Sequence, residues 1–250
     1  ITQKQTATQS QKLMIFVLSM SLYGLATLFP ELIPKFQVGL VEFSVEYFLF
    51  IPLTLAIPFA PLPAALGRST GSPLFTDVMR ALEPDLGIVI AFRMLPEVIW
   101  AMPRLGTFNL HASLLPQYRG AAPINWAIIN GERETGVTTF LLNHEIDKGA
   151  ILGQIHVPIG EEDTVGTMYE KLMQTGTGLV LDTVERIAAG EIQPVEQQQI
   201  DDRTLKPAPK IFKEDCRIDW SQPGRRIVDF IRGLSPYPAA WTALYREGSG

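Results

Sequence analysis

The sequence predicts an α/β fold with a mostly parallel sheet, because apolar strands alternate with helical segments along much of the chain. The clearest strand is LGIVIAF at residues 86–92, an uninterrupted apolar run typical of a strand covered on both faces. The clearest helix runs from Thr164, a favourable first-turn cap, to Gly190, a favourable stop. A chain of 250 residues can hold one large domain or two small ones.

The other elements are predicted from apolar periodicity and from flanking prolines and glycines. Pro84 ends a helix that begins near Phe75, and Pro123 suits the first turn of another helix, where its missing N–H is harmless. In chain order we expect a helix over 75–83, a short helix over 94–106, a strand over 107–113, a helix over 123–131, and strands over 136–143 and 151–159.

Charge and cysteine content exclude several classes of protein. The net charge of −5 argues against a nucleic-acid binder by overall composition, so such contact would need a local basic patch. The single cysteine, Cys216, gives no disulfide framework and fits a reducing, cytoplasmic compartment. His111, His144 and His156 lack metal-ligand spacing, so no metal site is expected.

The first part of the chain differs in composition from the rest. Residues 1–75 carry seven charged side chains, and the stretches 13–30 and 47–67 carry none. A bilayer span takes roughly 20 apolar residues, but the prolines of the second stretch would interrupt a helix. Three interpretations stay open: a membrane-associated segment, buried strands, or a segment produced by a reading-frame error.

One polar pair stands at the end of the strand predicted over residues 107–113. Asn109 and His111 are two residues apart, so their side chains project to the same side of the strand. An amide and a protonated imidazole aimed at one point can stabilise an oxyanion. Asp147, in the loop 144–150, could favour the charged imidazole. A purely structural role for all three residues is an equally good interpretation of the residue types.

The surrounding text resembles the folate-dependent formyltransferase family. The matching stretches are FNLHASLLPQYRGAAPINWAIINGE, TGVTTF and HEIDKGAILGQ, and the resemblance extends over residues 75–246. It implies a Rossmann-like catalytic core followed by the start of a small β-barrel domain. The expected division is an atypical segment over 1–72, the core over 73–200, and a linker with the start of a truncated C-terminal domain over 201–250.

The resemblance implies transfer of a formyl group from 10-formyltetrahydrofolate to the amino group of methionyl-initiator tRNA, with Asn109, His111 and Asp147 as the catalytic residues. An amino sugar nucleotide is the alternative acceptor. A protein of another class, an inactive folate-binding or membrane-associated remnant, is the remaining hypothesis.

Two sets of residues are expected to contact the folate. The resemblance implies contact through the segment SLLP, which comprises Ser113, Leu114, Leu115 and Pro116. A second wall is expected from Phe92, Met94 and Leu95, for which packing at a strand end is nearly as good an interpretation.

The segment 203–226 is the local basic excess of this acidic chain. Its basic residues are Arg203, Lys206, Lys210, Lys213, Arg217, Arg225 and Arg226, opposed by Glu214, Asp215 and Asp219. Phosphate contacts to tRNA would use such a segment, whereas a solvated linker is the structural alternative. No DNA partner is expected.

The first 75 residues depart from the family pattern. Members usually open with a strand, a Gly-Thr-Pro-Asp-like turn and then a basic loop, and neither feature occurs in this segment. We therefore favour a reading-frame error over a genuine membrane-associated segment for residues 1–72.

Overall fold

The computed structural model describes residues 15–19, 37–38, 41–42, 48–52, 73–81, 83–90, 95–197 and 202–244. The chain divides into two compact units, residues 1–108 and 109–250. Two of the expected folate contacts, Phe92 and Met94, lie outside the described residues, as does most of the segment 1–72.

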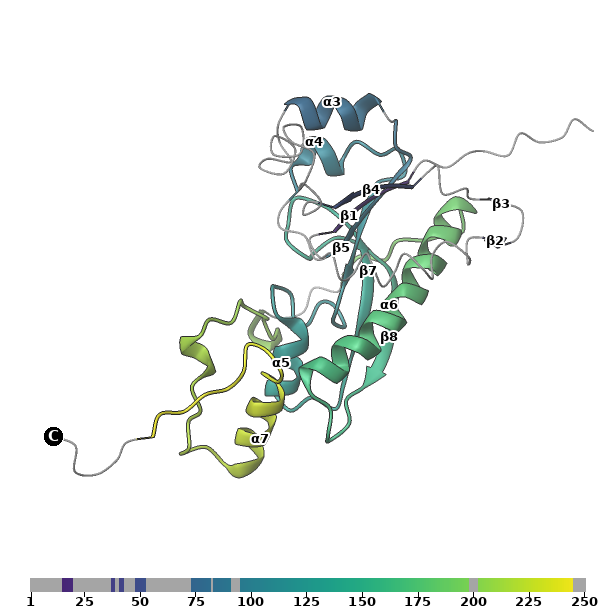
Figure 1. The fold of residues 1–250 in the computed structure, drawn as a ribbon. Helices are drawn as coiled ribbons and strands as arrows, with labels where there is room; N and C mark the ends of the chain where they lie inside the picture. Colours follow the sequence, from purple (N-terminus) through teal and green to yellow (C-terminus); the bar gives the residue numbers. More distant parts are fainter. Residues whose placement is uncertain are drawn as a thin grey trace, which may run out of the picture. The chain divides into compact units, whose positions relative to one another are not determined.

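The first unit is built on parallel strands. Strand β1 (Ile15–Ser19) pairs in parallel with β4 (Phe48–Pro52) on one side and with β5 (Leu86–Ile90) on the other (Figure 1). The short strands β2 (Gln37–Val38) and β3 (Val41–Glu42) pair with each other in antiparallel orientation. The parallel arrangement of β5 confirms the prediction made from its continuous apolar run.

Two helices accompany these strands. Helix α3 (Pro73–Ala81) and helix α4 (Glu97–Trp100) lie where periodicity predicted them. Met79 of α3 and Ile99 of α4 are fully buried. Helix α4 is short, and Thr107 Oγ1 donates a 2.7 Å hydrogen bond to the carbonyl oxygen of Trp100 at its end.

The second unit contains an antiparallel strand pair. Strand β6 (Thr107–His111) ends in this unit, followed later by β7 (Glu134–Leu141) and β8 (Ile151–Pro158). β7 and β8 pair in antiparallel orientation, with a register irregularity between Thr139 and Phe140. The fold is therefore α/β with parallel strands first and an antiparallel pair after them.

The long helix α6 (Val165–Ala188) lies along β7 and β8 (Figure 1). Its N-terminus is closed by a reciprocal pair in which Thr164 Oγ1 accepts from the Thr167 backbone and Thr167 Oγ1 accepts from the Thr164 backbone. Gly190 follows the helix with a φ of +69°, a conformation that glycine adopts without strain. Both predicted ends of the helix are confirmed.

Two shorter helices of the second unit pack against each other. Helix α5 (Pro123–Ile129) has proline in its first turn, as predicted, and contacts α7 (Gly224–Arg232) (Figure 1). Single 3-10 turns occur at η2 (Asp202–Thr204) and η3 (Glu214–Cys216). The expected barrel strands are not seen in the described residues 202–244, where Arg217 and Trp241 form an isolated bridge.

The buried Arg232 side chain forms an ion pair within α7 and connects this helix to the turn before α6. Arg232 Nε donates to Asp229 Oδ1 at 2.8 Å, and both side chains are almost fully buried. The Arg232 guanidinium also donates to the carbonyl oxygens of Gly160 and Asp163, each at 3.0 Å. Removing Asp229 would leave the buried guanidinium of Arg232 without a counter-charge, which is costly.

No helix in the part of the chain that the structure describes is long and apolar enough to cross a bilayer.

Candidate active site

Asn109 and His111 occupy the end of β6, as the strand prediction placed them. His111 is buried, with 7% of its surface exposed. The Oδ1 atom of Asn109 is also buried, and it has no hydrogen-bond partner in the described structure. Buried polar atoms are nearly always paired, so an unpaired acceptor on this strand is a feature that a bound group could satisfy.

The hydrogen bonding of His111 assigns different roles to its two ring nitrogens. Nε2 lies 2.9 Å from the carbonyl oxygen of Tyr118. Since a carbonyl only accepts, Nε2 must carry the proton of this hydrogen bond. Nδ1 faces Asp147 instead, at 4.0 Å from Oδ2. The ring edge of Phe140 packs against the imidazole at 6.5 Å between centroids.

Asp147 is held in place by contacts from outside its loop. Its φ of +54° is unusual for a residue other than glycine. Oδ2 accepts a 3.0 Å hydrogen bond from the Gly120 backbone N–H. The Asp147 carbonyl oxygen accepts from Arg119 Nε at 3.1 Å and from Gln197 Nε2 at 2.8 Å. The structure thus brings Asp147 to His111 from a separate loop, while the catalytic role of the pair stays a prediction.

Gly120 is required by close packing against the linker. Its φ is +127°, and a Cβ atom there would lie 2.4 Å from the Ala208 carbonyl oxygen. The two residues form a parallel bridge. Only glycine fits this contact, which also directs the Gly120 N–H towards Asp147.

The expected folate segment divides into buried and accessible residues. Ser113 and Leu115 are buried, whereas Leu114 and Pro116 are partly exposed. The Leu115 N–H donates to Thr138 Oγ1 at 3.3 Å, and the Leu115 carbonyl accepts from Gln154 Nε2 at 3.0 Å. The backbone of Leu115 is therefore engaged within the protein, and the accessible apolar surface of the segment comes from Leu114 and Pro116.

Leu95 is the member of the second predicted wall that the structure describes. Its side chain is 9% exposed and lies in the first unit. This burial agrees with the packing interpretation of Leu95.

Sequence reasoning missed a polar cluster beside His111. The Tyr118 hydroxyl donates to Glu132 Oε1 at 2.5 Å, and Lys206 Nζ forms an ion pair with the same carboxylate. Burial raises the pKa of Glu132, but the hydrogen bonds from Lys206 and Tyr118 outweigh burial and lower it overall. Tyr118 and Glu132 lie within the quoted family text, yet nothing in their spacing indicated that they meet.

The basic segment 203–226 is not uniformly available to a partner. Lys206 pairs with Glu132, and Arg225 Nε donates to Asp229 at 3.2 Å. Arg226 contacts the Ile129 carbonyl oxygen at 3.4 Å. Three of the predicted phosphate ligands therefore also make contacts within the protein.

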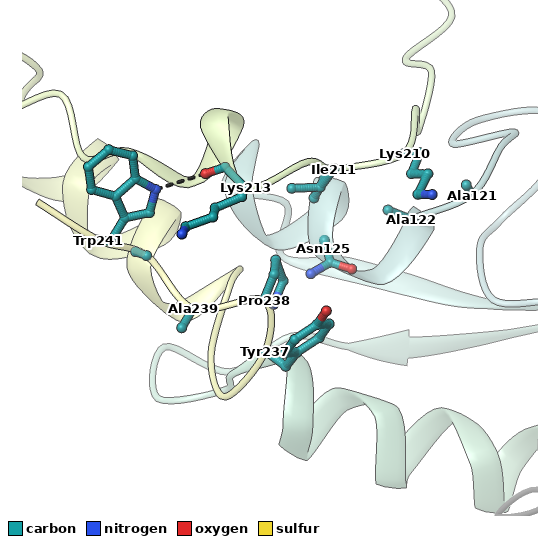
Figure 2. Close-up of a pocket in the computed structure, with 11 residues that line it drawn as sticks. Ala121, Ala122, Asn125, Lys210, Ile211, Lys213, Tyr237, Pro238, Ala239 and Trp241 are labelled. Carbon is teal, nitrogen blue, oxygen red and sulfur yellow. Dashed lines mark hydrogen bonds between the residues drawn. The ribbon is translucent and has the colours of Figure 1, made fainter.

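Lys210 and Lys213 instead line a pocket of about 580 Å³ beside the start of α5. Asn125, Tyr237 and Trp241 also line the pocket (Figure 2), and Tyr237 is 81% exposed. The Trp241 indole N–H donates to the Lys213 carbonyl oxygen at 2.8 Å. Two ammonium groups and an accessible aromatic ring suit a ligand that combines negative charge with flat rings.

The surroundings of the remaining histidines and of the cysteine favour structural or surface roles for these residues. His156 Nδ1 lies 2.9 Å from Glu134 Oε1 on the exposed face of the β7–β8 pair, and His144 is exposed. Cys216 is buried, and burial followed by Asp215 and Glu214 raises the pKa of its thiol. A raised thiol pKa opposes a nucleophilic role.

Comparison with known families covers most of the described chain. The formyl transferase family profile matches residues 57–184. The chain belongs to this family. The profile of the formyl transferase C-terminal domain matches residues 210–248, and that of a family of unknown function matches residues 14–89. In this formyl transferase, the candidate residues Asn109, His111 and Asp147 all fall within the first match.

Its curated relatives are longer proteins. The methionyl-tRNA formyltransferase of Parabacteroides distasonis is 58% identical over 188 residues, which are 74% of this chain and 58% of the relative. That of Phocaeicola vulgatus is 63% identical over 164 residues, which are 65% of this chain and 51% of the relative. The chain thus spans somewhat more than half the length of these relatives.

Solved structures share the fold of this formyl transferase. HypX from Aquifex aeolicus in complex with tetrahydrofolic acid superposes with a TM-score of 0.67 at 21% identity, over 93% of this chain and 36% of HypX. A sugar N-formyltransferase from Shewanella superposes with a TM-score of 0.67 at 22% identity, over 92% of each chain. At this identity the likeness concerns the fold alone.

Proposed function

We propose that this chain transfers a formyl group from 10-formyltetrahydrofolate to the amino group of methionyl-initiator tRNA. The observation that carries the proposal is the geometry of His111, whose Nδ1 faces Asp147 because Tyr118 occupies Nε2. Asn109 lies two residues earlier on the same strand, and its Nδ2 amide is the group that would donate to an oxyanion, since its unpaired Oδ1 can only accept. The curated relatives named methionyl-tRNA formyltransferase support the choice of reaction.

The reaction needs stabilisation of one developing charge and movement of one proton. The amine nitrogen attacks the formyl carbon, and the carbonyl electron pair moves to the oxygen, forming a tetrahedral oxyanion. Asn109 and protonated His111 donate to this oxygen. Asp147 stabilises the imidazolium and takes the proton of the attacking amine through water. The carbon–nitrogen bond to the folate then breaks, and that nitrogen receives the proton.

Folate contact is proposed through the accessible part of the SLLP segment. Leu114 and Pro116 offer partly exposed apolar surface, and the backbone of Leu115 between them is held by Thr138 and Gln154. A flat pterin is suited to such a surface. The structure of HypX with tetrahydrofolic acid shows that a protein of this fold binds a folate.

The acceptor is proposed to reach the site past the pocket lined by Lys210, Lys213 and Tyr237 (Figure 2). Ammonium groups bind phosphates, and an exposed aromatic ring can stack on a nucleobase. Of the basic segment 203–226, these two lysines are the phosphate ligands that we favour. An amino sugar nucleotide is the alternative acceptor, supported by the fold shared with the sugar N-formyltransferase from Shewanella.

We place the chain in the reducing cytoplasm, where the thiol of the buried Cys216 would persist. The core over 73–200 and the linker with partial C-terminal domain over 201–250 remain our proposed division of the chain.

The test is a formyl-transfer assay with purified chain and 10-formyltetrahydrofolate. Methionyl-initiator tRNA and a deoxythymidine-diphosphate amino sugar are offered in parallel, with the His111→Ala variant as control. We expect turnover on the tRNA that the variant lacks. Turnover on the amino sugar alone would establish the alternative. Folate binding without turnover on either acceptor would indicate an inactive remnant.

A further inference from the structure

We propose that Lys206, Glu132 and Tyr118 form a positioning relay that orients His111 through the Tyr118 carbonyl oxygen. The inference rests on the proposed function only for its consequence in turnover. Its structural content, the state of the His111 ring, can be measured without any substrate.

The relay acts on His111 at a single atom. The 2.9 Å contact between His111 Nε2 and the Tyr118 carbonyl oxygen holds the proton on Nε2. The neutral ring then presents an unprotonated Nδ1 towards Asp147, 4.0 Å away. Displacing the carbonyl would release this tautomer, because the partner of one ring nitrogen determines the state of the other.

The Tyr118 carbonyl needs external support to stay in this position. Tyr118 has a φ of +60°, which places it in the left-handed region. This conformation has a free-energy cost for any residue other than glycine. Its backbone N–H donates to the Lys206 carbonyl oxygen at 2.7 Å. At the other end, its hydroxyl donates to Glu132 at 2.5 Å and accepts from Asn130 Nδ2 at 3.3 Å. The backbone and the side chain of Tyr118 are thus both held while the residue keeps this left-handed conformation.

Lys206 provides both ends of this support. Its carbonyl oxygen receives the Tyr118 N–H, and its ammonium group pairs with the carboxylate that receives the Tyr118 hydroxyl. Its own backbone N–H donates to Gln117 Oε1 at 2.8 Å. A linker residue far along the chain therefore closes a ring of contacts around the residue that orients His111.

A second interpretation of Lys206 must be separated from this one. Its ammonium group belongs to the basic segment predicted to contact tRNA phosphates. A phosphate ligand acts on acceptor binding and on its salt dependence. A positioning residue acts on the histidine and on turnover. The two interpretations thus predict changes in different measured quantities.

The first measurement is the tautomer of His111, obtained by ¹⁵N NMR on the whole chain without substrate, at a pH high enough that the imidazole ring is neutral. We expect the Nε2–H form in the unmodified protein. Lys206→Met, Glu132→Gln and Tyr118→Phe should each raise the Nδ1–H fraction, and Lys206→Arg should restore the original spectrum. Arg186→Met is the matched control, since Arg186 forms an exposed ion pair with Asp182 on α6.

The second measurement is steady-state kinetics with methionyl-initiator tRNA. Lys206→Met should lower kcat about tenfold, as losing a histidine's orienting partner commonly does, while KM and its salt dependence stay unchanged. A higher KM with a weaker salt dependence, together with an unaltered His111 spectrum, would overturn the relay in favour of a phosphate contact.

An unaltered spectrum in folded Glu132→Gln and Tyr118→Phe would also overturn it. Absence of turnover in the unmodified chain would refute the proposed function but leave the NMR result decisive for the relay.

Discussion

The carboxylate of Asp147 faces the Nδ1 atom of His111 at 4.0 Å and is held there by the backbone N–H of Gly120. At this separation the two groups form no direct hydrogen bond. In the proposed mechanism, this gap leaves the Nδ1–H of a protonated His111 available to a reacting oxygen.

Asn109 is predicted to contribute to the chemical step. Asn109→Ala removes a candidate oxyanion donor from the end of β6, and we expect kcat to fall by about 10²–10³-fold. KM for the folate should change little, because the interaction forms mainly in the transition state. Turnover near that of the unmodified chain would remove Asn109 from the mechanism.

Asp147 is predicted to act through its charge. Asp147→Asn keeps an oxygen that can accept from the Gly120 N–H, but it cannot stabilise an imidazolium or take a proton. We expect kcat to fall by about 10²–10⁴-fold, measured by formyl transfer at neutral pH. Glu145→Gln is the control, since Glu145 belongs to the same loop and forms an exposed ion pair with Lys148. An equal loss in both variants would indicate damage to the loop.

Gly120 is predicted to be irreplaceable by alanine. A Cβ there would lie 2.4 Å from the Ala208 carbonyl oxygen, and the φ of +127° adds strain. Gly120→Ala should lower the free energy of unfolding by about 1–3 kcal/mol, measured in urea, and should lower turnover by displacing Asp147. Gly178→Ala is the matched control, because open space surrounds Gly178 on α6. That change should stabilise the chain by up to about 1 kcal/mol.

Lys210 and Lys213 are predicted to bind tRNA phosphates. The variants Lys210→Ala and Lys213→Ala should raise KM for methionyl-initiator tRNA and leave kcat nearly unchanged. Each should reduce the slope of log affinity against log salt concentration by about 1. Lys171→Ala, which removes a lysine paired with Asp163 away from the pocket, should leave that slope unchanged.

Asp163 is predicted to make stability depend on pH. Burial raises its pKa, but hydrogen bonds from Lys171, the Gly160 N–H and Thr167 outweigh burial and lower it overall. A lowered folded-state pKa stabilises the protein above the ordinary value of 3.8, and this stabilisation is lost as pH falls through the folded pKa.

Asp163→Asn should therefore cost about 1.5–3 kcal/mol of unfolding free energy at neutral pH. The difference from the unmodified chain should shrink below pH 3.8. Urea titrations at a series of pH values measure this difference in unfolding free energy, with Asp182→Asn at an exposed position as control. A difference that stays constant with pH would contradict a role for the charge.

Local sequence patterns were sufficient for most elements of the catalytic core. Helix α6, with its Thr164 cap and Gly190 stop, and the parallel strand β5 follow from short-range physics that a sequence displays directly. The pairing of Asn109 and His111 followed from the two-residue period of a strand. The expected barrel strands depended instead on resemblance, and the described residues 202–244 do not contain them.

Only the tertiary structure decided how the candidate site is assembled. The sequence by itself determined which residue types stand at the end of β6 and in the loop of Asp147. It could not determine that Tyr118 holds His111 through a carbonyl oxygen, or that Lys206 is committed to Glu132. The first contact uses a backbone carbonyl, which every residue carries, and the second joins two side chains that are 74 residues apart in the chain. No residue pattern marks either contact, and the packing of the linker against the core creates the second.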